Sequence, residues 1–383
     1  MISERTKKMP PFIVMDVLEK AQEMERAGID IIHLEVGEPD FDTPSCIKKA
    51  IVKALDNGDT HYTHSLGLFE IRHEICKYYK LRYKVLIEPD QIIITSGTSP
   101  AMLLLFGALI HKGDQIIISD PHYACYPNFI NFLEGVPVTV PVHEESGFQL
   151  LPDAIKQKIN SKTKAILINS PSNPTGNLLS FACMKGISEF AKSDAPFIIS
   201  DEIYHGLVYE GVEHCILEFT DNAFVLNGFS KLYAMTGLRL GYVIAPKPFI
   251  RPMQKLQQNF FISANSIVQH AGIAALSSAG ADVEYMKETY NKRRQYMIGR
   301  LKSMGFNFTV EPTGAFYIFA NAKHISNDSY KLAFDILKNA HVGVTPGIDF
   351  GKNGEGYLRF SYANSLENIA KGMARIEKYF SQL

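Results

Sequence analysis

Five short apolar runs in the middle of the sequence are each followed directly by polar residues whose types could do chemistry. The polar segments are residues 96–100, 120–123, 170–176, 201–204 and 228–231. Ligands of open α/β sheets bind beyond the carboxyl ends of the strands. If the runs are parallel strands, we expect all five segments to meet at one edge of the sheet.

Two of these segments contain residues with a specific chemical use. Ser99 is a natural N-cap and Pro100 a natural first helical residue, which predicts a helix whose free backbone N–H groups could bind a phosphate. Lys231 directly follows an apolar strand, where an amine could form a Schiff base with a carbonyl group. Each feature alone has an ordinary explanation, because a capped helix needs no ligand and a lysine at a strand end can extend to solvent.

Taken together, the segments supply the parts of a pyridoxal phosphate site. They offer free N–H groups for a phosphate, an amine, a carboxylate at Asp201 and an aromatic ring at Tyr123 that could stack on the cofactor. A carboxylate beside the pyridine nitrogen keeps that nitrogen protonated, so the ring can accept electrons from a carbanion. The combination therefore favours a functional interpretation that no single residue would justify.

The apolar runs are typical of strands that are buried on both faces of a sheet. They are four or five residues long and flanked by turn residues, and helical patterns such as 102–111 and 180–192 lie between several of them. This alternation predicts an α/β fold with a mostly parallel sheet. The runs are residues 91–95, 115–119, 165–169, 196–200 and 223–227, with a sixth at 241–245.

The two ends of the chain have a different pattern. Residues 12–29 form an amphipathic helical pattern that leads into an apolar run at 31–35, and long charged helical patterns dominate from about Asp282 onward. We therefore expect a large domain at 46–281 and a smaller α+β domain built from 1–45 and 282–383. The expected C-terminal elements are helices at 283–304, 330–339 and 366–380 and strands at 315–319 and 357–361.

Composition and charge exclude several classes of protein. With 39 Lys and Arg against 40 Asp and Glu, the net charge is −1, so neither a nucleic-acid nor a membrane-surface role is expected. The 46% of hydrophobic residues excludes disorder as the main state. Five scattered cysteines without a C-x-x-C pair, and no signal-peptide pattern, favour a reduced, cytoplasmic chain. The 12 histidines have no metal-ligand spacing, so no metal centre is expected.

The same residues resemble the class I/II aminotransferases, in the aspartate aminotransferase-like branch of fold-type I pyridoxal-phosphate enzymes. The resemblance covers nearly the whole chain, with the motifs in the family's order. It implies a large, mostly parallel sheet domain flanked by helices and a smaller α+β domain from both termini. It also implies pyridoxal 5'-phosphate as cofactor and a homodimer with shared active sites. The motifs are residues 34–40, 61–67 with Arg72, 169–176, 230–231, 237–241, 314–317 and Arg359.

The resemblance implies catalytic roles for Lys231, Asp201 and Tyr204. Lys231 would hold the cofactor as an internal aldimine and move the proton between the quinonoid and ketimine stages. Asp201 would pair with the pyridinium, while Tyr204 and Asn173 would hydrogen-bond the ring hydroxyl oxygen. Tyr123 would stack on the ring.

The resemblance also implies how phosphate and substrate are held. The phosphate would lie on the backbone N–H groups of Thr98 and Ser99, on Ser230 and Arg239, and on Tyr62 of the partner subunit. The substrate α-carboxylate would be bound by Arg359, with Asn173 beside it. Gly37 would let its backbone approach that carboxylate closely.

The implied reaction moves an amino group between an L-amino acid and a 2-oxo acid. Many aspartate-using relatives carry Lys where this chain has Ser99, and many relatives have Tyr or Phe where it has His122. Residues 10–14, which lie over the active site in relatives, are apolar. Because an unpaired buried carboxylate is costly, these features favour an amino donor with an uncharged side chain; Arg251 is only a distant candidate cation.

Two alternative functions remain open from the sequence. One is a carbon–sulfur β-lyase on the same scaffold, which would eliminate a β-substituent where an aminotransferase reprotonates. The other is a protein that uses the scaffold for regulation or binding with weak catalysis. The complete set of site residues argues against the second.

Overall fold

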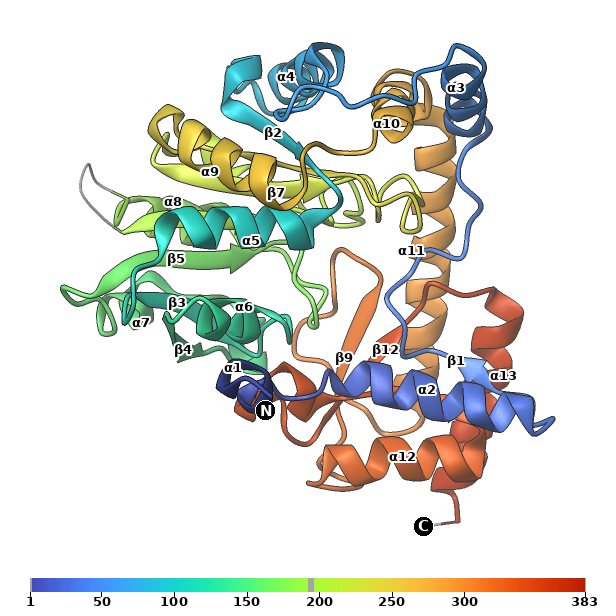
Figure 1. Cartoon of the computed structure of the whole chain (residues 1–383). Helices are drawn as coiled ribbons and strands as arrows, with labels where there is room; N and C mark the ends of the chain where they lie inside the picture. Colours follow the sequence, from blue (N-terminus) through green and yellow to red (C-terminus); the bar gives the residue numbers. More distant parts are fainter. Residues whose placement is uncertain (1, 192–195, 383) are drawn as a thin grey trace.

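The computed structural model describes residues 2–191 and 196–382, and a seven-stranded sheet lies at its centre (Figure 1). The strand order is β2-β8-β7-β6-β5-β3-β4, and β8 alone runs antiparallel to its neighbours. The expected α/β fold with a mostly parallel sheet is therefore confirmed. The strands are β2 (Ile92–Thr95), β3 (Gln115–Asp120), β4 (Val136–Pro141), β5 (Thr163–Asn169), β6 (Phe197–Asp201), β7 (Ala223–Gly228) and β8 (Gly241–Ile244).

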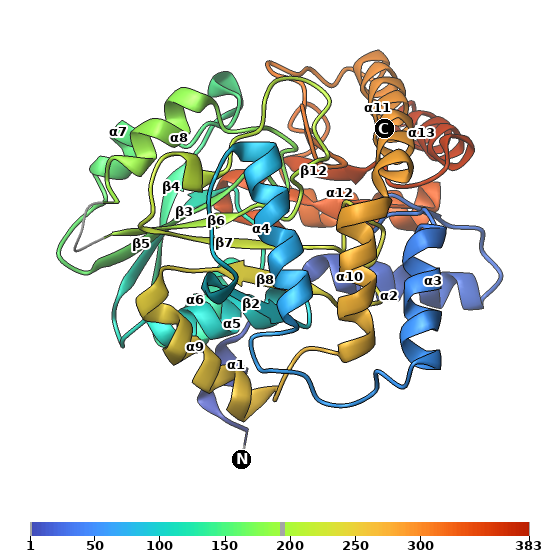
Figure 2. The same cartoon turned by 90° about the horizontal axis from the view of Figure 1, so that it is seen from above.

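The central strands are continuous apolar runs because helices cover both faces of the sheet (Figure 2). Neighbouring side chains of β2 enter different cores, since Ile93 packs with one face and Ile92 and Ile94 with the other. One face is covered by α5 (Thr98–Leu109), α6 (Tyr126–Phe132) and α9 (Lys247–Phe260). The other is covered by α4 (Phe69–Tyr83), α7 (Pro152–Lys156), α8 (Phe181–Ser188) and α10 (Ser266–Ser278).

Strand β4 is absent from the sequence-based expectation. Its sequence begins and ends with Val136 and Pro141, and Pro137 lies next to its start. Proline cannot donate to a strand ladder, so it is tolerated at the edge of a sheet, where β4 lies. The partly exposed strand consequently lacks the continuous apolar run that marks the central ones.

A second group of elements combines the two ends of the chain (Figure 1). β1 (Ile32–His33) pairs in parallel with β10 (Val342–Gly343), and β9 (Tyr317–Asn321), β12 (Tyr357–Ser361) and β11 (Thr345–Pro346) form an antiparallel sheet. The apolar run at 31–35 thus contains a strand of only two residues. The division into domains at 46–281 and at 1–45 with 282–383 stays a prediction. The remaining helices are α1 (Glu4–Lys8), α2 (Ile13–Arg26), α3 (Ser45–Asp56), α11 (Gly280–Ser303), α12 (Ser329–Ala340) and α13 (Leu366–Phe380).

The helical patterns match observed helices with shifted ends. The pattern at 12–29 is α2, and that at 102–111 is the later part of α5. Within 180–192, helix α8 ends at Ser188, and Lys192 lies outside the described residues. Across residues 2–191 and 196–382, no helix is long and apolar enough to cross a membrane.

Candidate functional site

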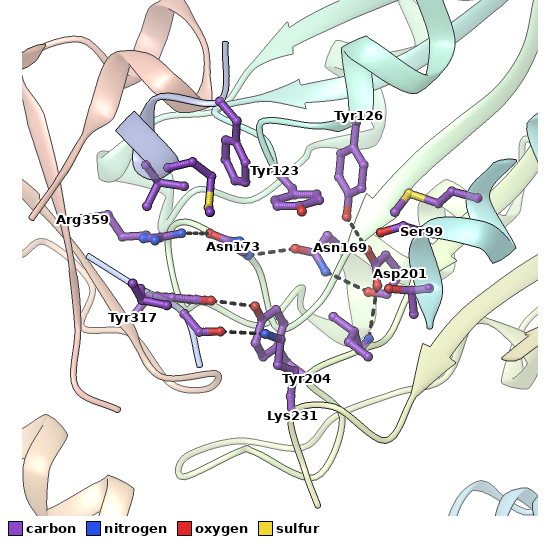
Figure 3. Close-up of a pocket in the computed structure, with 18 residues that line it drawn as sticks. Ser99, Tyr123, Tyr126, Asn169, Asn173, Asp201, Tyr204, Lys231, Tyr317 and Arg359 are labelled. Carbon is purple, nitrogen blue, oxygen red and sulfur yellow. Dashed lines mark hydrogen bonds between the residues drawn. The ribbon is translucent and has the colours of Figure 1, made fainter. Parts of the chain in front are cut away.

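A cavity of about 230 Å³ lies where the carboxyl ends of the central strands face the group of elements from the two chain ends (Figure 3). Asp201 ends β6, Thr98 opens the helix after β2, and Arg359 lies on β12. The cavity thus gathers residues that are up to 347 positions apart, from Phe12 to Arg359. The predicted site residues that line it are Gly37, Thr98, Ser99, Tyr123, Asn173, Asp201, Tyr204, Lys231 and Arg359.

Three of the predicted site residues do not line this cavity. Ser230 is buried beside Lys231, and Arg239 is exposed. Tyr62 is 85% exposed, and its side chain belongs to the surface of its own chain. Whether Tyr62 reaches a partner subunit stays a prediction.

Asp201 is a buried carboxylate held by two donors. The Tyr126 hydroxyl donates to Oδ2 at 2.6 Å, and the backbone N–H of Ile203 donates to Oδ1 at 3.2 Å. Burial raises the pKa of Asp201, while the two hydrogen bonds and the charges of His205 and Lys231 lower it. The balance leaves the pKa above its ordinary value, so this carboxylate would be stabilised by a cationic partner in the cavity.

Lys231 points into the cavity from the loop after β7, and its Nζ donates to the backbone carbonyl of Gly37 at 2.6 Å. Burial lowers its pKa to about 8, helped by the positive charges of Arg359 and Arg239, whereas Glu38 and Asp201 oppose the shift. Near pH 8 about half of the amine is therefore neutral and nucleophilic.

A chain of side-chain amides links Asp201 to Arg359 (Figure 3). Asn169 donates to the Asp201 backbone carbonyl at 2.9 Å and accepts from the Asn173 backbone N–H at 2.8 Å. Arg359 Nη1 then donates to Asn173 Oδ1 at 3.0 Å. This chain fixes the guanidinium relative to the carboxylate at the other end of the cavity.

The Arg359 guanidinium is buried and only partly satisfied. Its Nη2 donates to the backbone carbonyl of Glu35 and to Thr345 Oγ1 at 3.1 Å. The guanidinium carbon Cζ lies 4.4 Å from the centre of the Tyr317 ring. Within the described residues its buried Nε has no hydrogen-bond partner. A buried cation with a free donor is suited to bind a carboxylate.

Tyr317 explains why position 37 is a glycine. A Cβ atom on Gly37 would lie 1.8 Å from the Tyr317 hydroxyl oxygen. That hydroxyl also pairs with the Tyr204 hydroxyl at 2.7 Å. Close approach of a substrate carboxylate to Gly37 stays a prediction, and the structure supplies a separate packing reason for the glycine.

The start of α5 corrects one sequence-based expectation. The N-cap is Gly97, with φ of 97° and no side-chain capping bond, so the prediction that Ser99 caps the helix is wrong. Glycine adopts this positive φ readily, which lets the chain turn from β2 into α5 two residues earlier. Pro100 is accommodated in the first turn, where its missing N–H costs no bond, and the N–H groups of Thr98 and Ser99 stay free of helix bonds.

Arg239 lies against this turn although it does not line the cavity. A Cβ on Gly97 would lie 2.5 Å from Arg239 Nη2, and Arg239 Nη1 donates to the Thr236 carbonyl at 2.9 Å. Free N–H groups at a helix start with an arginine beside them form an anion-binding arrangement.

Sequence reasoning missed three residues that shape the site. Tyr126 bonds Asp201, Asn169 bridges Asp201 to Asn173, and Tyr317 packs on Arg359. Asn169 could have been found, because it ends an apolar strand next to Asp201 in the sheet. Tyr126 gave no such signal, since an isolated tyrosine is equally typical of a core, whereas Tyr317 ends the motif 314–317 but had no role assigned to it. No group of three or more potential metal ligands occurs among the described residues.

Comparison with known proteins gives consistent matches along the chain. The family model for aminotransferase class I and II matches residues 29–376. The (5-formylfuran-3-yl)methyl phosphate transaminase of Methanocaldococcus jannaschii is 43% identical over 100% of both chains. The aspartate aminotransferase of Pyrococcus horikoshii is 41% identical over 98% of this chain and 96% of its own.

Solved structures agree with the sequence matches. A Methanococcus jannaschii protein, whose active site is described as similar to kynurenine aminotransferases, superposes with a TM-score of 0.91 and 42% identity over 99% of this chain and 100% of its own. Thermus thermophilus aspartate aminotransferase with maleate gives a TM-score of 0.95 and 34% identity over 99% of both chains. These relatives carry different substrates in their names, so the matches define a family rather than a substrate.

Proposed function

The chain belongs to the class I and II aminotransferases, in the aspartate aminotransferase-like branch of fold-type I, and from that premise we propose how its own residues work. We propose that it moves an amino group between an L-amino acid and a 2-oxo acid, with pyridoxal 5'-phosphate as cofactor. The observation that carries the proposal is the shared cavity of Lys231, Asp201 and Arg359.

The residues around the cavity fit pyridoxal phosphate. Asp201 would hold the ring nitrogen, Tyr123 would lie on the ring face, and Asn173 and Tyr204 would bind its hydroxyl oxygen. When bound, the cofactor supplies an electron sink for a carbanion at the substrate Cα. The fit is supported by the buried carboxylate of Asp201, which has donors but, among the described residues, no cation in bonding contact, and by the lowered pKa of Lys231.

The phosphate would lie at the start of α5. The proposed donors are the N–H groups of Thr98 and Ser99, the hydroxyl of Ser230 and the guanidinium of Arg239. Gly97 has no side chain, and the guanidinium of Arg239 lies beside its backbone, which supports this phosphate site.

The substrate and its reacting proton are assigned to three side chains. Arg359 would bind the α-carboxylate, with Asn173 and the backbone of Gly37 beside it; its guanidinium lines the cavity, and its buried Nε has no partner among the described residues. Lys231 would hold and move the proton at the substrate Cα, a task suited to an amine whose pKa is about 8.

We expect the preferred amino donor to have an uncharged side chain. Phe12, Val14 and Met15 line the cavity, and the charged lining residues among those described are Asp201, Lys231 and Arg359, which are already used. Arg251 lies outside the lining, bonded to Gln254. Donors can be compared by kcat/KM with one fixed keto acid. If aspartate exceeds alanine, phenylalanine and leucine by about tenfold, or about 1.4 kcal/mol in the transition state, the proposed preference for an uncharged side chain is wrong.

The function is tested by product analysis on the purified enzyme. With amino acids and 2-oxoglutarate or pyruvate, we expect exchange of amino groups between keto acids. Ammonia release would instead indicate the carbon–sulfur β-lyase.

Borohydride treatment should attach the cofactor to Lys231, and the Lys231→Ala variant should fold but lose turnover. Normal transamination by Lys231→Ala would overturn the assignment.

We also propose a homodimer with shared active sites, in which Tyr62 reaches the phosphate of the partner's site. The 85% exposure of Tyr62 supports a role outside its own chain. A cytoplasmic location stays a prediction from cysteine usage.

A further inference from the structure

We propose that Asp349 is a positioning residue that sets substrate selectivity, by anchoring the first turn of α2 as a wall of the active site. The inference rests on the proposed aminotransferase function. It concerns a residue outside the cavity lining, on the short turn Gly347–Phe350 that precedes β12.

Helix α2 has no cap of its own. Its N-cap residue is Phe12, whose side chain makes no capping hydrogen bond. Asp349 supplies the missing acceptor from a distant part of the sequence, because its Oδ1 accepts from the Ile13 N–H at 3.0 Å and its Oδ2 from the Val14 N–H at 3.2 Å. A carboxylate at a helix start satisfies N–H groups that lack partners and interacts favourably with the helix dipole.

The charges around Asp349 are mixed. Arg359 attracts the carboxylate, while Asp16 in the first turn of α2 repels it. Burial, and to a smaller extent the charge of Asp349, raises the pKa of the Cys125 thiol just before α6. The Asp349 carboxylate is therefore held mainly by the two backbone N–H groups of α2. Removing the carboxylate should accordingly affect the first turn of α2.

The anchored turn carries side chains of the cavity. Phe12, Val14 and Met15 line it, and the Phe12 ring meets Tyr123 edge-on, with centroids 6.1 Å apart. In Figure 3 the blue N-terminal ribbon passes beside Tyr123 and Arg359. These residues form an apolar wall that a large substrate side chain would touch and that the methyl group of alanine would contact less.

The rest of α2 is held independently of Asp349. Val17 and Ala21 pack with Ile31 and with Leu337 of α12 in a small apolar cluster. Loss of the Asp349 carboxylate should therefore loosen the first turn while the helix stays in place. The expected effect is on selectivity between substrates rather than on folding.

The test compares Asp349→Ala and Asp349→Asn with wild type. Losing a helix-capping acceptor should lower kcat/KM for phenylalanine or leucine about fivefold, with alanine changed by less than about twofold. Amide hydrogen exchange at Ile13 and Val14 should quicken about fivefold in Asp349→Ala, and less in Asp349→Asn, which keeps one acceptor oxygen.

Asp328→Ala is the matched control, because Asp328 caps α12 by accepting from the Lys331 N–H at 2.8 Å, away from the cavity. It should leave the donor ratio unchanged. If wild type transaminates no donor, the proposed function fails. If wild type is active but both Asp349 variants keep its donor ratio and its exchange at Ile13 and Val14, the anchoring role is overturned. Exchange is measured on the folded protein and needs no turnover.

Discussion

The surroundings of Asp201 both oppose and support its charge. Burial disfavours the carboxylate, while Tyr126 and the Ile203 N–H stabilise it. A carboxylate in such a place gains most from a cation that enters with a ligand, because few water molecules remain to solvate it. A protonated ring nitrogen would be such a cation, and the ion pair with Asp201 would keep that nitrogen protonated.

Asp201→Asn should therefore reduce kcat/KM by roughly a hundredfold or more, since one well-placed electrostatic contact in such a site contributes on the order of 3 kcal/mol. Tyr126→Phe is the matched comparison, because it removes a donor to the carboxylate and leaves the charge. It should lose less, about tenfold. Activity of Asp201→Asn within about threefold of wild type would mean that the carboxylate does not bind the ring nitrogen.

Single residues were predictable where a strand end determines their position. Asp201 and Lys231 follow apolar runs, and parallel strands bring such ends to one cavity. The roles of Tyr126 and Tyr317 were not predictable, because they depend on which group each tyrosine hydroxyl meets after packing. Asp349 could not be found either, since its partners Ile13 and Val14 lie more than 330 residues away along the chain.

At the scale of elements, apolar runs predicted the existence of strands better than their direction. β8 is an apolar run like its neighbours, yet it runs antiparallel to β7 and β2. Direction depends on the path of the connection, which side-chain pattern alone does not record. The start of α5 was misplaced because Gly97 turns the chain through a positive φ that the serine-proline pattern does not reveal.

The link between α2 and β1 should make stability depend on pH. His33 on β1 contacts Glu35 at 2.6 Å and Glu25 of α2 at 3.1 Å. The hydrogen bond to Glu35 raises the pKa of His33 to about 9, with further help from Glu25, against the opposing effect of burial. The folded pKa lies above the unfolded value of about 6.5, so the stabilisation is fully present below pH 6.5 and is lost as the pH rises through 9.

The measurement is the free energy of unfolding of wild type and His33→Gln between about pH 6 and about pH 10. Wild type should be the more stable at the acidic end, and the difference should shrink across the predicted window. His111→Gln, whose side chain is 84% exposed, controls for the substitution itself. A wild-type advantage that grows with pH would show that His33 is not held as the cation.

At the scale of the whole molecule, large apolar side chains are exposed at several places on the surface. Val52 and Leu55 on α3, Phe260 at the end of α9 and Ile262 just after it are each at least half exposed. The segment that carries Tyr62 packs on α10, since Gln269 of α10 donates to Thr63 at 3.0 Å, and α10 in turn packs on α3. Exposed apolar residues of this size are typical of protein interfaces. They support the proposed homodimer, in which a cavity built by one chain is completed by another.

A mixed dimer tests whether Tyr62 crosses between subunits. One chain carries Lys231→Ala and the other Tyr62→Phe, so a crossing tyrosine would leave one site with both defects and the other with neither. The intact site should give about half of the wild-type kcat and the wild-type affinity for pyridoxal phosphate, because every group that contacts its phosphate is unaltered. If Tyr62 acted in its own chain, the site that keeps Lys231 would carry the Tyr62→Phe defect. The mixed dimer would then show the weaker cofactor affinity of the Tyr62→Phe homodimer, and that result would place Tyr62 outside the shared site.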